Sequence, residues 1–415
     1  MKKSFLLTAI FWTGCILGQI QEEILPPNYI KSIEFRGNSN ITGNPIIQLG
    51  EQLTLDFDDI IGDEADYYYT VNYYNYNWSP SELVKAEYME GFDNTRIYNY
   101  TNSFNTLQPY THYKLKIPNK DTQGFKVSGN YMLKVFNNNK EIVFSRKFMV
   151  YQPLTQVGVS IKRSRDLNFI NSKQVVNFIV DSPDLLLRNP EQTVKIVILQ
   201  NHILKSAIKD INPQYTIGNQ LMYKYDQETA FWAGNEYLYF DSKDVRSPTI
   251  NINRIELLDL YHHYLFTDRA RDTEPYTYNP DINGQFVIRN LQGVNSSIEA
   301  DYVWTHFNFQ NYDPLDGGEI YMYGAFNNFE LDASTLMTYN KISGLYENAQ
   351  LFKQGFYNYK YVLLRKDGSI DQGFFSGNFD KTENEYQVLV YFRDLGSRYD
   401  KIIGLGSANS INITN

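Results

Sequence analysis

The sequence contains almost no cysteine and little histidine. Its single cysteine, Cys15, lies within the first 18 residues, so the rest of the chain has no means of forming a disulfide or a cysteine-ligated zinc site. None of the five histidines has the His-Glu-x-x-His spacing of a zinc protease. Phosphate-binding Gly-x-x-x-x-Gly-Lys runs and Gly-x-Ser-x-Gly nucleophile elbows are also missing, which leaves these enzyme classes without support. The histidines are His112, His202, His262, His263 and His306.

Long hydrophobic runs are missing as well, apart from one near the start. Lys2 and Lys3 precede an apolar stretch that ends at Gly18, which predicts a secretory signal peptide over 1–18 and a mature start at Gln19. The stretch is shorter than the roughly 20 apolar residues of a membrane-spanning helix. A lipoprotein processing site ending at Cys15 is the alternative, although such a site normally has Leu where Trp12 stands.

Basic charge is in deficit. The chain has 38 Lys and Arg against 47 Asp and Glu, a formal net charge of −9 that loss of Lys2 and Lys3 would make more negative. Nucleic acids and anionic lipids are bound through Lys and Arg, so neither is an expected partner. We therefore expect an exported protein that is soluble or peripheral, and no nucleic-acid function.

Aromatic residues are abundant, with 35 Tyr and 26 Phe. Aromatic residues suit the half-buried faces of pleated sheets, and the chain of 415 residues exceeds what one hydrophobic core usually serves. The expected fold class is all-β, as tandem β-sandwich domains.

The region 19–152 is expected to form the first sandwich. Its short alternating runs are separated by polar turns, which is typical of immunoglobulin-like or fibronectin-like domains. The missing cysteine pair favours the fibronectin-like variant. The expected strands are 52–58, 68–76, 96–100, 112–117, 130–136 and 141–151.

Two further regions are expected, a middle β-rich domain over 153–295 and a C-terminal β-sandwich over 296–415. The segment 267–283 is rich in charge, Pro and Tyr and is expected to be a loop or connector. The expected strands are 157–161, 174–180, 194–199, 220–225, 236–240, 255–261 and 284–289, then 298–309, 319–323, 344–347, 354–364 and 385–392.

The run Gly324–Phe329 followed by Gly355–Tyr361 resembles the small sandwich that binds starch and glycogen. That sandwich usually stacks a Trp on the sugar, and Phe329 stands at this position. The resemblance covers only about 295–415.

Candidate chemistry is sparse. Two carboxylates roughly 5 to 10 Å apart can hydrolyse glycosides, and Asp313 with Asp316, or Asp56 with Asp59, are close in sequence. Such short acidic runs are more often solvated turns. The pair His262 and His263 is expected on a strand, where neighbouring side chains point to opposite faces and do not readily share one metal ion.

Two surface clusters have a functional and a structural interpretation. The basic run Lys162–Arg165 could meet an acidic partner, but a charged strand edge that prevents aggregation explains it more simply. The runs Tyr67–Tyr69 and Tyr73–Tyr74 supply rings to both faces of a strand, so some are expected to reach solvent and could anchor an interface.

Several longer runs resemble the plug protein of the type IX secretion system. They are Thr277–Arg289, Glu299–Phe307, Tyr323–Asn328, Lys353–Tyr361, Gly377–Tyr386 and Asp400–Gly404, and the similarity extends through the first region. The resemblance implies a non-catalytic periplasmic protein, monomeric within a hetero-complex, that closes a large SprA-type outer-membrane translocon barrel. It implies no cofactor, metal or small-molecule substrate, and it assigns no contact residue.

Two other hypotheses remain open at this point. One is a carbohydrate-binding protein of the cell envelope that uses residues such as Phe329 and Tyr357. The other is an enzyme that depends on a carboxylate such as Asp313.

Overall fold

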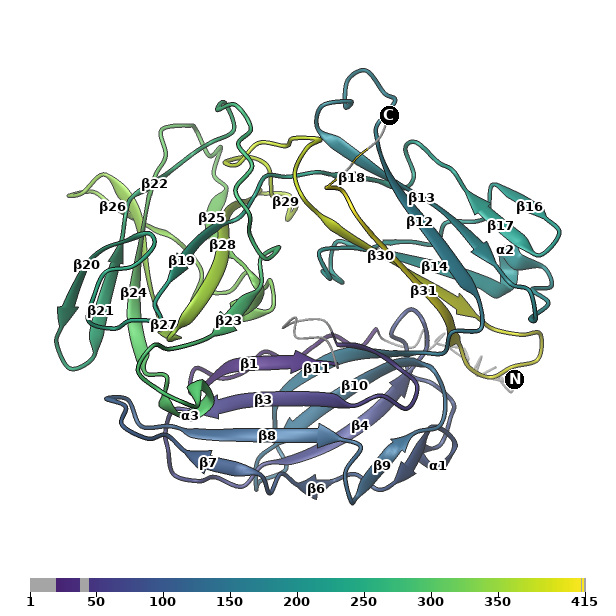
Figure 1. The fold of residues 1–415 in the computed structure, drawn as a ribbon, viewed down its shortest axis with the longest axis horizontal. Coiled ribbons are helices and arrows are strands. Elements are labelled where there is room, and N and C mark those ends of the chain that lie inside the picture. Colours follow the sequence, from purple (N-terminus) through teal and green to yellow (C-terminus); the bar gives the residue numbers. More distant parts are fainter. Residues whose placement is uncertain (1–19, 38–44, 412, 414–415) are drawn as a thin grey trace, which may run out of the picture.

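The computed structural model describes residues 20–37, 45–411 and 413. The expected signal peptide over 1–18 and Cys15 lie outside the described residues. Strands dominate the fold and pair into three β-sandwiches that surround a common centre (Figure 1). The expected all-β class with tandem sandwiches is confirmed.

The first sandwich contains strands β1 to β11. Strand β4 alternates, so Tyr69, Val71 and Tyr73 face a core that they share with Phe57 and Phe148. One sheet is β1 (Ile30–Arg36), β3 (Leu53–Asp59), β8 (Thr111–Ile117) and β7 (Tyr100–Asn102); the other is β2 (Ile46–Gln48), β11 (Ile142–Tyr151), β10 (Gly129–Phe136), β4 (Tyr68–Tyr74) and β6 (Thr95–Arg96). Helix α1 (Lys85–Tyr88) and the pair β5 (Met89–Gly91) and β9 (Thr122–Phe125) flank them.

The second sandwich takes strands from two distant parts of the chain. Its core combines Val176 and Phe178 of one sheet with Ile196, Val388 and Val390 of the other. The first sheet is β12 (Gln156–Arg163), β13 (Lys173–Asp181), β17 (Gln220–Tyr223), β16 (Tyr215–Ile217) and β18 (Ala230–Trp232). The second sheet is β15 (Ile208–Lys209), β14 (Val194–Gln200), β30 (Glu385–Phe392) and β31 (Lys401–Asn409), with helix α2 (Pro190–Thr193) before β14.

The third sandwich lies between these two parts of the chain. Its core includes Phe240, Phe307, Tyr359 and Met322. One sheet is β19 (Leu238–Asp241), β28 (Gly355–Leu364), β23 (Phe286–Ile288), β25 (Glu319–Tyr323) and β29 (Ile370–Asp371); the other is β20 (Ile252–Leu257), β21 (Tyr261–Leu265), β24 (Tyr302–Gln310), β27 (Leu345–Lys353), β26 (Thr338–Asn340) and β22 (Asp268–Arg269). Helix α3 (Ser296–Glu299) and the 3-10 helix Ala325–Asn327 connect strands.

The strand expected over 255–261 is instead a hairpin, because residues 258–260 form the turn between β20 and β21. The two strands pair in antiparallel register from Ile252 with Leu265 to Leu257 with Tyr261. An uninterrupted apolar and acidic run concealed this turn, which contains no Gly or Pro.

The sheets divide the chain differently from the boundary expected at 295. Strand β30 pairs with β14 from Val194 opposite Phe392 to Gln200 opposite Tyr386, almost two hundred residues away in sequence. Figure 1 shows the yellow strands β30 and β31 beside the teal strand β14. The third sandwich is therefore inserted within the second, and the regions 153–295 and 296–415 are not separate sandwiches. Short-range patterns do not reveal such a partner.

Two glycines of β31 allow it to cross close to β12. A Cβ added to Gly406 would lie 2.6 Å from the backbone oxygen of Val157, and one added to Gly404 would collide with Thr155. At each position the added Cβ would be closer than a normal van der Waals contact, so a side chain at either position would push the strands apart. The two sheets of the second sandwich meet at this corner.

We predict that Gly406→Ala lowers the free energy of unfolding by about 1–3 kcal/mol, as expected for overpacking against a backbone that has no room to yield. The matched control is Gly158→Ala on the neighbouring strand, where an added Cβ has no atom within 4 Å. Urea denaturation of the two variants tests the idea, and equal stabilities would contradict it.

Candidate functional site

The first and second sandwiches meet in an apolar junction. Four of its side chains come from the first sandwich and five from the sheet of β14, β30 and β31. All nine are buried, so the two sandwiches share a hydrophobic layer as continuous as a domain core. The apolar junction consists of Tyr74, Trp78, Met132, Met149, Val197, Leu199, Leu389, Tyr391 and Ile402.

Polar contacts border the apolar junction. Asp400 receives two hydrogen bonds from Arg393, at 2.9 and 2.8 Å, and a third from the Tyr76 backbone N–H at 2.9 Å. The Tyr391 hydroxyl donates to Asn130 at 2.7 Å, and the Tyr73 hydroxyl donates to the Asp400 carbonyl. Asp400 therefore ties the turn before β31 to the first sandwich.

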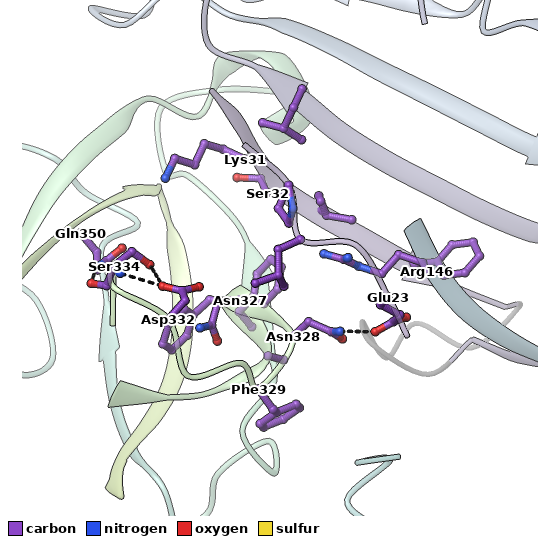
Figure 2. A pocket seen from close by; sticks show the side chains of 18 of the residues that line it. Glu23, Lys31, Ser32, Arg146, Asn327, Asn328, Phe329, Asp332, Ser334 and Gln350 are labelled. Atoms are coloured by element: carbon purple, nitrogen blue, oxygen red, sulfur yellow. Dashed lines mark hydrogen bonds between the residues drawn. The ribbon is translucent and has the colours of Figure 1, made fainter. Parts of the chain in front are cut away.

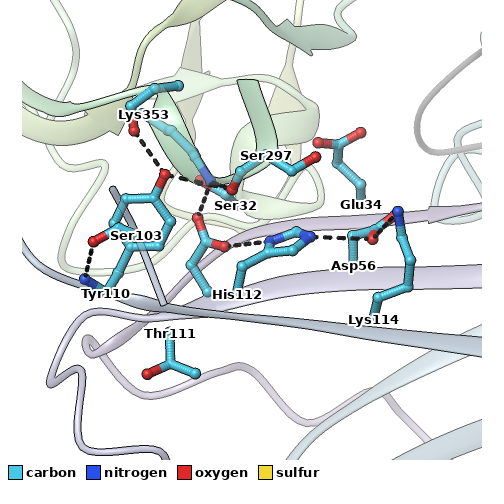
Figure 3. A network of polar contacts seen from close by, with 12 residues as sticks. Ser32, Glu34, Asp56, Ser103, Tyr110, Thr111, His112, Lys114, Ser297 and Lys353 are labelled. Carbon is cyan, nitrogen blue, oxygen red and sulfur yellow. Dashed lines mark hydrogen bonds and ion pairs between the residues drawn. The ribbon is translucent and has the colours of Figure 1, made fainter. Parts of the chain in front are cut away.

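The first and third sandwiches meet in an ionic junction centred on Asp58 of β3 and Lys353 of β27 (Figure 3). The lysine Nζ lies 2.6 Å from Asp58 Oδ2, and both side chains are almost fully buried. Tyr302 donates its hydroxyl to the same oxygen at 2.7 Å, and Lys353 also donates to the Ser297 carbonyl at 2.6 Å. Burial lowers the pKa of Lys353, and the charge of Asp58 opposes that effect.

His112 extends the ionic junction along the outer face of the first sandwich. Its Nδ1 lies 2.7 Å from Asp58 and its Nε2 lies 3.4 Å from Asp56. Asp56 also lies 3.1 Å from both Lys114 and Arg36. Burial alone would lower the pKa of His112, but hydrogen bonds to the two carboxylates outweigh it and raise this pKa. Burial would raise the pKa of Asp56, but the surrounding cations hold it below its usual value.

The ionic junction has the residue types of a catalytic centre but not the arrangement. Both ring nitrogens of His112 face carboxylates, so the ring has no free nitrogen with which to accept a proton from a nucleophile. The nearby Ser32 hydroxyl is hydrogen-bonded to Tyr302 at 2.8 Å. The geometry suits a charged contact between two sandwiches.

Further hydrogen bonds follow the ionic junction along the same border. The Tyr110 hydroxyl donates to the Ala300 carbonyl at 2.8 Å, and Asp301 accepts from the backbone N–H groups of Leu107 and Gln108. The third sandwich is thus held along the edge of the first by several partly buried contacts.

The remaining histidines lie apart. His263 faces inward, where burial lowers its pKa to about 4, while His262 faces outward, so the expected opposite orientation is confirmed. His262 Nδ1 lies 2.8 Å from Nε2 of His306 on the neighbouring strand β24. His202 binds Gln387 and Glu385 within the second sandwich. Within the described ranges, no group of three or more His, Cys, Asp or Glu side chains is arranged to hold a metal ion.

The acidic candidates separate into two kinds. Asp313 and Asp316 are exposed in the loop before β25, as expected of a solvated turn. Asp56, Asp58 and Asp59 instead lie on β3 and are each at most 3% exposed. The expectation of a solvated turn was wrong for this run, because cations on the neighbouring strands neutralise its outward side chains.

The carbohydrate hypothesis named two rings that lie mostly inside the protein. Phe329 is packed against Tyr323 near Ile203 of the second sandwich, and Tyr357 lies in the core of the third. Their exposed fractions are 7% and 2%. Neither ring lies on the outer surface of the protein, although both border an internal cavity.

Four of the five tyrosines in the run 67–69 and 73–74 are buried within the protein. Tyr67, Tyr69 and Tyr73 belong to the first core, and Tyr74 belongs to the apolar junction. The first three face the inner core, and the second sandwich covers Tyr74 on the outer face of β4. Tyr68 is partly exposed, so of this run only its ring reaches the solvent side. The basic run Lys162–Arg165 ends β12, which is an edge strand, and Arg163 pairs with Asp380 at 2.8 Å.

Sequence analysis did not identify the residues of the ionic junction, although the sequence contains a partial indication of them. Strand β3 places Asp56 and Asp58 on its outer face, opposite His112 and Lys114 on β8. Acids facing bases across two strands indicate a charged outer layer. Lys353 had no such signal, because its partner lies 295 residues away.

Comparisons with known proteins agree with this architecture. A family profile described as the type 9 secretion system plug protein 1st domain matches residues 30–152, which is the first sandwich. A crystal structure of a hypothetical protein from Parabacteroides merdae is 33% identical and superposes with a TM-score of 0.89. That match covers 93% of this chain and 98% of the other.

The chain belongs to the type IX secretion system plug protein family. This membership connects the chain to type IX secretion. A second structure, the BSP domain of a biofilm associated protein, reaches a TM-score of only 0.17 at 8% identity, over 95% of this chain and 61% of that one. The search of curated proteins found no match.

We predict that Lys353→Met destabilises this plug-family protein by about 3–5 kcal/mol, because it leaves Asp58 buried without its lysine. The double variant with Asp58→Asn should recover part of the loss, since the uncompensated charge is then gone. Denaturant unfolding measures both, with exposed Lys341→Met as the control. A single variant as stable as the control would contradict the prediction.

The raised pKa of His112 predicts a pH dependence. A histidine that binds its proton more tightly when folded contributes its full stability below its unfolded pKa of about 6.5, and that contribution is lost as pH rises through the folded pKa. The difference in unfolding free energy between the wild type and His112→Gln should therefore shrink as pH rises above about 6.5. Urea titrations at several pH values test this, and a difference that grows with pH would refute it.

Proposed function

We propose that the protein docks on the periplasmic end of a large outer-membrane translocon barrel of the SprA type and closes it when no substrate is in transit. Membership of the type IX plug family is the observation that carries this proposal. The junctions support it physically, because they join three sandwiches into one body that is wider than any single sandwich.

A stopper for a wide pore has to resist deformation. A barrel large enough for folded cargo leaves an aqueous lumen, and a chain of loosely tethered domains would not seal it. The apolar junction and the ionic junction remove that freedom, because separating the sandwiches would expose a shared hydrophobic layer and a buried ion pair. Rigidity thus comes from side chains rather than from disulfides.

The proposed contact is a reversible one. A plug has to leave when substrate arrives, so its interface with the barrel should be polar and of moderate size rather than an obligate hydrophobic one. The acidic net charge of −9 suits a soluble partner of this kind. Among the described residues, no helix has the length and apolarity needed to cross a membrane. We propose, from the family membership, that the protein is periplasmic, peripherally bound at the outer membrane and monomeric within a hetero-complex.

We predict that the tagged protein co-purifies with a large outer-membrane barrel from mild-detergent extracts. Cells without the protein should become more permeable to large hydrophilic dyes, because the idle pore is then open. If the eluate contains no large outer-membrane barrel, the proposal is contradicted.

A variant can test whether closing the pore requires the sandwiches to be rigidly joined, or only requires the protein to be present. Leu389→Asp places a charge in the apolar junction, while the neighbouring Val388 and Val390 still face the core of the second sandwich. We expect this variant to keep strand content by circular dichroism yet fail to restore the permeability barrier. Lys341→Met, which alters an exposed loop, is the control and should restore it. Full restoration by Leu389→Asp would show that a rigid body is not needed.

A further inference from the structure

A cavity of about 580 Å³ lies where the three sandwiches meet (Figure 2). Its walls come from the segment that leads into β1, from β11, from the loop after β14, from residues 325–334 and from β27. Cavities of this size hold small organic ligands. It lies beside the ionic junction, with which it shares Ser32, and nothing in the proposed plugging role uses it.

Arg146 of β11 points its guanidinium into this cavity (Figure 2). The residue is only 7% exposed. One guanidinium nitrogen donates to the Ser145 carbonyl at 2.9 Å, and the group lies 5.6 Å from the centre of the Phe144 ring. No carboxylate of the described chain lies within ion-pair distance of Arg146. Its other guanidinium donors have no hydrogen-bond partner among the described residues, and a buried guanidinium in that state is costly unless an anion reaches it.

The acids of the cavity wall are already engaged. Glu23 accepts hydrogen bonds from the Lys147 backbone N–H and from Asn328, and Asp332 accepts from the backbone and hydroxyl of Ser334. Burial lowers the pKa of Arg146, and the nearby charges of Glu23 and Glu330 oppose this without forming a contact. Among the residues that the structure describes, the guanidinium of Arg146 therefore has no carboxylate partner.

The rest of the wall mixes apolar side chains with polar and basic ones, among them Lys31, Lys205 and Gln350. The side-chain oxygen of Asn327 is buried and has no hydrogen-bond partner. The cavity thus offers a cationic donor, a free acceptor and an aromatic and aliphatic surface. The apolar lining residues include Ile33, Phe35, Ile203, Leu204, Phe326 and Phe352.

We propose that this cavity binds an organic carboxylate with an apolar or aromatic body. The carboxylate pairs with the planar guanidinium of Arg146, which presents two parallel N–H donors to such a group. The body of the ligand lies on the apolar wall, and Asn327 accepts a hydrogen bond from a ligand donor. Two sources share this chemistry, a free small acid and the C-terminal carboxylate of a peptide.

The test uses the purified full-length protein and isothermal titration calorimetry. The probes are 3-phenylpropionate, its amide, and a short peptide that ends in Phe with either a free or an amidated C-terminus. We expect at least one acid to bind, and its amide to bind at least tenfold more weakly because the charge-assisted pair is lost. Binding of the small acid indicates a free metabolite, and selective binding of the free peptide indicates a chain end.

Arg146→Met and exposed Arg165→Met form the matched pair of variants. Arg146→Met should abolish the preference for acid over amide while leaving the melting temperature unchanged or higher, because it removes an unpaired buried charge. Arg165→Met should bind like the wild type. The proposal is overturned if no acid binds the wild type at millimolar concentration, or if Arg146→Met binds the acid equally well. It is also overturned if Arg146→Met melts at a clearly lower temperature, which would show that Arg146 serves the fold. These outcomes do not depend on the barrel, so they are independent of the proposed plugging function.

Discussion

The architecture depends on a strand that is buried on both faces. Strand β30 sends Val388 and Val390 into the core of the second sandwich and Leu389 and Tyr391 into the apolar junction. One face therefore completes a sandwich, and the other attaches that sandwich to its neighbour. Because successive side chains of a strand point in opposite directions, both tasks are encoded in a single apolar run.

The ionic junction complements this apolar contact at the other side of the first sandwich. Buried ion pairs are weak sources of stability, since desolvation offsets much of the attraction, but they tolerate few alternative geometries. Asp58 is contacted by His112 of its own sandwich and by Lys353 and Tyr302 of the third, so two side chains of the third sandwich have to meet one carboxylate. The apolar junction thus holds the second sandwich against the first, while the ionic junction defines the orientation of the third sandwich relative to the first.

The sequence allowed much of the fold to be predicted, and physical reasons explain where it did not. Alternation in runs such as 52–58 and 130–136 revealed strands and their inward faces, because that signal is local. The β14–β30 pairing, the burial of Tyr74 and the contact of Asp58 with Lys353 all join segments distant in sequence. A single sequence carries no periodicity for such contacts, so the domain boundary at 295 and the solvated acidic run were wrong. The cavity at Arg146 was equally hidden, since its walls come from all three sandwiches.

The insertion of the third sandwich within the second has a consequence for how the chain matures. During synthesis, strands β12 to β18 are made first, and the second sheet of their sandwich is incomplete at that stage. Its strands β30 and β31 follow only after more than a hundred further residues. The entropy cost of closing so long a loop is small, because it grows only slowly with loop length. Until the loop closes, however, the incomplete sandwich exposes unpaired strand edges. The first and third sandwiches have all their strands earlier and can shield those edges. The second sandwich and its apolar junction with the first sandwich are therefore completed only when residues 385–409 are in place.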